Sequence, residues 1–165
     1  MKYIDKTLDI ITFTAKAIAG TLLAIMLIVS VVEVFRRYLF NATFQGSEEL
    51  VRFSLVWVSF LGGAAAYRHG GLVLIGLLVD RLPKKAKAVV SFLTNTSVLL
   101  FCLYMLNSAW KYTFTSSVSK QVAIGLGIPM KLPYFGIVLG LILIIIFSLD
   151  NYRRLIPDVF GKEGG

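Results

Sequence analysis

The sequence has few of the side chains on which catalytic and metal-binding sites depend. Its 165 residues include one cysteine and one histidine, so they offer no zinc ligand set, no Cys–His catalytic pair and no internal disulfide. Neither a GxSxG nucleophile motif nor a phosphate-binding Walker loop occurs. These absences argue against an enzyme. They also lead us to expect no metal or other cofactor on this chain.

Charge is missing from four long stretches, at residues 17–32, 53–67, 88–110 and 132–149. A helix crosses the hydrocarbon core of a bilayer with about 20 mostly apolar residues. The third and fourth stretches suffice alone, whereas the first two must extend past Glu33 and back through Arg52. The apolar runs are continuous rather than alternating, which argues against a β-barrel.

The sequence therefore predicts an all-α integral membrane protein with four transmembrane helices in a single membrane domain, residues 1–165. The predicted spans are about 17–38, 47–67, 88–110 and 132–150. Residues 1–16 mix apolar and charged side chains and are expected to lead into the first helix at the interface. The first run is followed by "VVEVFRRY" and not by a small-residue cleavage site, so we interpret it as an anchor rather than a signal peptide.

Lysines and arginines give the chain a net charge of +8. They cluster at the ends of the apolar runs, which points to a membrane and not to nucleic acid. Of the 17, eleven fall on the side of the two termini and five on the other, with Arg52 near a helix start. The positive-inside rule then places both termini in the cytoplasm.

Between the second and third spans lies a shorter apolar run, Leu72–Val79. As a helix it would be about 12 Å long, too short to cross the bilayer. We expect a short helix at the cytoplasmic interface, at about residues 71–83, with the basic residues that follow facing membrane lipids.

Six ionisable residues flank the turn between the first two spans. Glu33 is three and four residues before Arg36 and Arg37, the spacing at which helical side chains meet. These groups could form an ion or proton site, or an ion pair that reaches water at the outer interface.

The second span starts with "GSEELVRF". Ser47 is positioned to cap the helix, Glu48 and Glu49 suit the positive end of its dipole, and Arg52 is within reach of both acids. Two interpretations remain open. The stretch is a capped helix start, or its charges join the first two helices to each other or to a partner.

Small residues occur where helices could approach closely, in "GGAAA" at 62–66 and at Gly136 and Gly140. Cys102 lies inside the third span and is expected to be a small buried residue. His69 has no acidic or cysteine companions and is expected to be an interfacial residue.

An ordered series of short motifs extends over about residues 33–150. It consists of Arg37-Tyr38, Ser47-Glu48-Glu49, Trp57, Phe60-Leu61-Gly62, Arg68 with Gly70, "LLVDRLP" at 77–83 and "IPMKLPYFGIVLG" at 128–140. In this order and spacing it resembles the small (DctQ-like) membrane subunit of tripartite ATP-independent periplasmic (TRAP) transporters. Members of that family often carry a His and an Asp where this sequence has Leu72 and Gly76, so no role is expected for that pair here.

The resemblance implies a multi-pass scaffold subunit in a bacterial inner membrane. Two partners are expected: a large membrane subunit and a periplasmic binding protein. The large subunit takes up an organic anion, such as a C4-dicarboxylate or sialic acid, together with sodium, and the binding protein delivers that anion. Sodium would bind the large subunit. The alternative is an autonomous small carrier or channel. The candidate residues for helix pairing or for a partner interface are Glu33, Arg36, Arg37, Tyr38, Ser47, Glu48, Glu49, Arg52, Trp57, Gly62, Arg68, Pro129, Gly136 and Gly140.

Overall fold

Five helices make up the part of the chain that the structure, a computed structural model, describes: residues 2–41, 43–69 and 83–160. They are α1 (Lys2–Phe40), α2 (Gln45–Arg68), α4 (Lys84–Thr113), α5 (Ser116–Lys120) and α6 (Lys131–Phe160). All except α5 are long and apolar enough to cross a membrane. The prediction of an all-helical protein with four spans is confirmed. The interfacial segment predicted at 71–83 lies outside the described residues, except for Pro83 at the start of α4.

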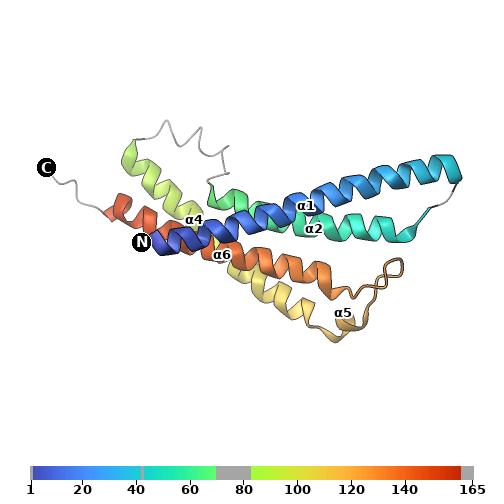
Figure 1. The fold of residues 1–165 in the computed structure, drawn as a ribbon. Helices are drawn as coiled ribbons and strands as arrows, with labels where there is room; N and C mark the ends of the chain where they lie inside the picture. The colour runs from blue at the N-terminus through green and yellow to red at the C-terminus, as the bar shows by residue number, and fades with distance from the viewer. Residues whose placement is uncertain (1, 42, 70–82, 161–165) are drawn as a thin grey trace.

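The start of α1 and the end of α6 lie at the same end of the molecule (Figure 1). The turn between α1 and α2 and the loop that contains α5 lie at the opposite end. This arrangement agrees with an even number of crossings. The positive-inside rule predicts that the end with the start of α1 is cytoplasmic, so we call it the cytoplasmic end and the other the outer end.

Helix α1 is a single element of 39 residues, about 58 Å long at 1.5 Å per residue. The expected lead-in at residues 1–16 is thus continuous with the first span. The helix ends where Asn41 takes a φ of 47°, the left-handed conformation that commonly stops a helix. Because α1 is about twice as long as a bilayer core is thick, it must tilt or project from the membrane.

The main contacts between helices run in the order α1–α2–α6–α4. Leu8, Ala64 and Phe147 form a small buried cluster that joins α1, α2 and α6. A second cluster, Ala15, Ala19 and Leu61, joins α1 and α2, and partly buried side chains of α6 pack against it. Small alanines let the helix backbones approach closely. Many large apolar side chains point outward instead, as expected when lipid replaces water around the helices.

The outer loop between α5 and α6 folds back on itself as a short hairpin. Val122 forms an isolated bridge with Pro129, and the Ala123 N–H donates to the Ile128 carbonyl at 2.9 Å. Gly127 has a φ of 66°, which a glycine adopts without strain. Neither α5 nor the hairpin was predicted from the sequence.

Candidate assembly sites at both ends of the helices

Arg68, in the last turn of α2, joins three helices at the cytoplasmic end. Its Nη2 lies 2.6 Å from Asp9 Oδ1 on α1, and its Nη1 lies 3.9 Å from Asp150 Oδ2 on α6. The side chains of Arg68 and Asp150 are 8% and 9% exposed. Arg153 also reaches Asp150, at 3.2 Å. Arg68 was a candidate from the sequence, but neither acid was predicted, although Asp150 follows the last apolar run.

Tyr67, which precedes Arg68 in the chain, belongs to a network of uncharged polar side chains that joins α2, α4 and α6. Asn95 is 2% exposed, and its Oδ1 accepts hydrogen bonds from the Tyr67 hydroxyl and from Asn151 Nδ2. Its Nδ2 donates to the Ser148 carbonyl at 3.1 Å. Buried polar groups in a membrane need such partners on neighbouring helices. This network was not predicted from the sequence, where its signal is a few polar residues near the cytoplasmic ends of apolar runs.

At the outer end, Glu33 binds backbone and not an arginine. Its Oε1 accepts a hydrogen bond from the Phe44 N–H at 2.8 Å, so it ties α1 to the turn that precedes α2. Among the described residues no ion pair joins it to Arg36 or Arg37. The predicted ion pair is wrong, because the turn brings an unpaired N–H closer to the carboxylate than either guanidinium.

Helix α2 begins earlier than predicted, at Gln45, with Phe44 at the N-cap position and no side-chain cap. Ser47 is therefore already inside the first turn. Its hydroxyl donates to the Phe44 carbonyl instead of accepting from an N–H. The predicted capping role of Ser47 is wrong.

Glu49 ties the start of α2 to the outer hairpin. Its Oε2 accepts hydrogen bonds from the Gly125 N–H and the Leu126 N–H, both at 2.9 Å. The backbones approach so closely that a Cβ on Gly125 would lie 2.5 Å from the Gly46 nitrogen. Of the adjacent acids Glu48 and Glu49, Glu49 thus joins distant parts of the chain, and it does so through backbone amides rather than through arginines.

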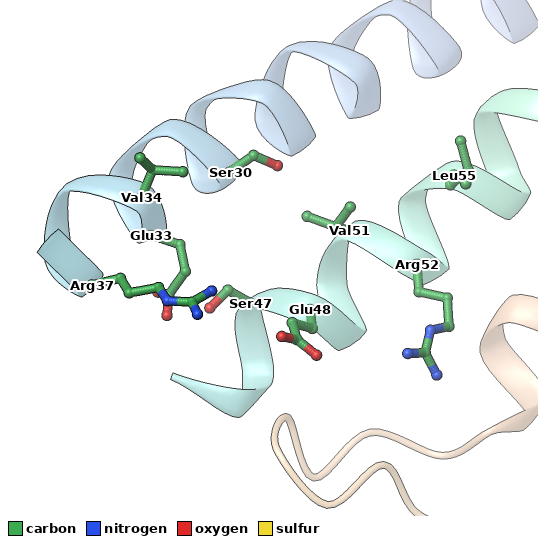
Figure 2. A pocket seen from close by; sticks show the side chains of 9 residues that line it. All are labelled: Ser30, Glu33, Val34, Arg37, Ser47, Glu48, Val51, Arg52 and Leu55. Carbon is green, nitrogen blue, oxygen red and sulfur yellow. The ribbon is translucent and has the colours of Figure 1, made fainter. Parts of the chain in front are cut away.

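The remaining outer charges have no ion-pair partner in the described parts of the chain. Glu48, Arg36, Arg37 and Arg52 are all exposed, and the predicted Glu48–Arg52 pairing is not found among those residues. Glu48, Arg37 and Arg52 line a groove of about 490 Å³ between α1 and α2 (Figure 2). The other lining residues are Ser30, Glu33, Val34, Ser47, Val51 and Leu55.

Two glycines of α6 allow it to pack closely on α2, as predicted. A Cβ on Gly136 would lie 2.9 Å from the Trp57 ring, and one on Gly140 would lie 2.5 Å from the Phe60 Cβ. Trp57 also donates from Nε1 to the Leu132 carbonyl at 3.2 Å. Gly62 differs, because a Cβ there would meet no described residue within 4 Å, so it mediates no close packing within the described part of the chain.

The last two candidates lie on outer surfaces. Tyr38 is 81% exposed near the end of α1. Pro129 closes the hairpin and accepts a hydrogen bond from the Leu132 N–H. Of the other residues discussed above, Cys102 is 3% exposed, in agreement with its expected burial, and His69 is exposed at the end of α2.

Taken together, these sites hold helices and loops in place. In the described ranges no three His, Cys, Asp or Glu residues are grouped so that they could hold a metal ion. Most of the buried charged and polar groups described above bind one another or the backbone, whereas Arg68 Nη1 has no hydrogen-bond partner in the described part of the chain. The arrangement can fix the geometry of a membrane-embedded unit and present its surfaces to other components.

Comparison with known proteins supports the same conclusion. The family model described as "Tripartite ATP-independent periplasmic transporters, DctQ component" matches residues 25–158. A protein of Haemophilus influenzae that is named as a TRAP transporter small permease is 30% identical over 158 residues, which are 96% of this chain and 91% of that protein. The family consists of transporter subunits and not of enzymes. The chain thus belongs to the DctQ family, the small permease components of TRAP transporters, and is a multi-pass protein of the bacterial inner membrane.

Proposed function

We propose that this subunit is a scaffold on which the large membrane subunit of a TRAP transporter is assembled. The large subunit would take up an organic anion, such as a C4-dicarboxylate or sialic acid, together with sodium. A periplasmic binding protein would deliver the anion. Sodium and substrate would bind the large subunit, and this chain would carry no cofactor.

The observation that carries the proposal is the open arrangement of the helices. Only 6% of the most apolar 18-residue stretch of α1 is buried against the rest of the chain. The main helix contact of α1 is with α2. Three helical glycines, Gly20, Gly62 and Gly63, have open space where a Cβ would be. Glycines of this kind let a second transmembrane helix approach closely, so α1 and α2 offer a surface for a partner helix.

Co-purification tests the scaffold role. The tagged chain is expressed with the large membrane subunit, and uptake of the anion is measured in cells with and without the chain. We expect a stable complex, and uptake only when both subunits are present. A large subunit that is stable and transports without this chain would contradict the proposal.

A matched pair of variants tests the surface. Gly63→Leu should reduce co-purification, because the new side chain occupies the open space on α2, whereas Leu100→Ala, on the exposed face of α4, should not. Liposomes that contain the purified chain alone should show no flux of sodium or anion. Flux in that experiment would favour an autonomous carrier or channel.

A further inference from the structure

The groove between the outer ends of α1 and α2 combines an apolar wall with a charged mouth. Val34 of α1 and Val51 and Leu55 of α2 line the wall. Arg37 reaches from α1 toward the first turn of α2, and Glu48 and Arg52 line the groove from α2 (Figure 2). None of the roles described above uses this groove.

The charges at the mouth are available to a ligand. Neither Arg37 nor Arg52 has a carboxylate within 4 Å in the described parts of the chain, and Glu48 has no cation there. Glu33, the other acid that lines the groove, is already bound to the Phe44 N–H. Guanidinium groups bind phosphate through paired, charge-assisted hydrogen bonds. A carboxylate next to them favours a ligand that also carries a positive charge.

The position of the groove selects the kind of ligand. It lies at the outer ends of two helices that are apolar enough to cross the membrane, where we expect the headgroups of the outer leaflet to meet the acyl chains. A ligand that fits must have a phosphate, a cationic group and an apolar chain in one molecule. Phosphatidylethanolamine has all three.

We propose that this groove binds a zwitterionic aminophospholipid of the outer leaflet, with the ammonium at Glu48, the phosphodiester at the guanidinium groups of Arg37 and Arg52 that flank Glu48, and an acyl chain along Val51 and Leu55. The site does not depend on the proposed scaffold function. Phosphatidylglycerol should bind less well, since it has no ammonium group for Glu48. Inorganic phosphate and glycerophosphoethanolamine should bind weakly, because neither has an acyl chain.

Native mass spectrometry of the delipidated full-length chain tests the proposal. Phosphatidylethanolamine, phosphatidylglycerol, glycerophosphoethanolamine and inorganic phosphate are titrated separately. We expect phosphatidylethanolamine to bind most tightly, and roughly tenfold more weakly after Arg37→Ala or Arg52→Ala, since one charge-assisted hydrogen bond corresponds to about that factor. Glu48→Gln should remove the preference over phosphatidylglycerol.

Arg36 supplies the matched control, because it is exposed on α1 beside Arg37 but does not line the groove. Arg36→Ala should change lipid affinity less than twofold. Leu55→Trp is a second variant that fills the apolar wall and leaves the arginines intact. It should weaken the lipid but not inorganic phosphate.

Three results would overturn the proposal. One is equal lipid affinity in the wild type and in the Arg37→Ala/Arg52→Ala double variant. Another is an effect of Arg36→Ala as large as that of Arg37→Ala. The third is a photo-crosslinker at position 55 that captures a protein segment in native membranes, since the occupant would then be a partner and not a lipid.

Discussion

The contact between Glu49 and the outer hairpin makes a sharp prediction about local stability. Glu49 is half-buried and accepts two backbone hydrogen bonds at 2.9 Å, from Gly125 and Leu126. Replacing it with alanine removes both bonds and leaves two N–H groups to find water. The hairpin should then detach from α2 more often, while the helices stay in place.

The magnitude follows from the two bonds. A hydrogen bond to a charged group contributes about 1.5–3 kcal/mol. Because Glu49 is partly exposed, we expect a loss of about 2–4 kcal/mol for the pair. A change of about 1.4 kcal/mol is tenfold in an equilibrium constant. The Gly125 and Leu126 amides should therefore exchange with deuterium roughly 30- to 700-fold faster.

Hydrogen exchange measured by NMR or mass spectrometry on the purified chain in micelles provides the assay. Glu49→Gln keeps a neutral acceptor oxygen, so its effect should be about half as large in free energy. The Ala123 amide is an internal reference. It donates to Ile128 within the hairpin and should keep most of its protection.

Glu48→Ala is the matched control, since Glu48 is the adjacent acid, is exposed and has no hydrogen bond or ion pair among the described residues. It should leave exchange in the hairpin unchanged. The reasoning fails if Glu49→Ala leaves exchange at Gly125 and Leu126 at the wild-type rate. It also fails if Glu48→Ala accelerates exchange to the same extent.

Three further predictions concern thermal stability of the purified chain in detergent. Arg68→Ala should destabilise the folded chain by about 3 kcal/mol, because it removes one charge from a buried pair with Asp150. Asp9→Asn should cost less than about 1 kcal/mol, because Asp9 is 67% exposed. Equal effects of the two variants would contradict this ranking. Gly140→Ala should destabilise the folded chain by about 1–3 kcal/mol, because its Cβ would lie 2.5 Å from the Phe60 Cβ. Gly63→Ala, where a Cβ meets nothing within 4 Å, should be neutral or stabilising by up to about 1 kcal/mol. A Gly140→Ala variant as stable as the wild type would show that α2 and α6 do not pack as described. Asn95→Ala should destabilise the folded chain by about 1–3 kcal/mol, because it loses hydrogen bonds to three neighbours. Asn107→Ala, at an exposed site on the same helix, should have no effect. An Asn95→Ala variant as stable as the wild type would mean that the network adds no stability.

The sequence by itself determined the four spans. Whether a stretch of about 20 residues crosses a bilayer depends on its own side chains, and the chain has charge-free runs such as 88–110 and 132–149. Each predicted span falls within an observed helix. The close approach at Gly136 and Gly140 was also predictable, because a missing side chain is a local property.

Only the tertiary structure decided which polar groups bind one another. Asp9 and Arg68 are 59 residues apart, and Glu49 and Gly125 are 76 apart. Such pairs depend on the order in which the helices pack and on the face that each turns inward, and neither is fixed by the hydropathy of a single segment. Local spacing favoured Glu33 with Arg36 and Glu48 with Arg52. The folded chain brings unpaired backbone N–H groups to Glu33 and Glu49 instead, because an N–H at a turn or hairpin has no regular partner and a carboxylate satisfies it well.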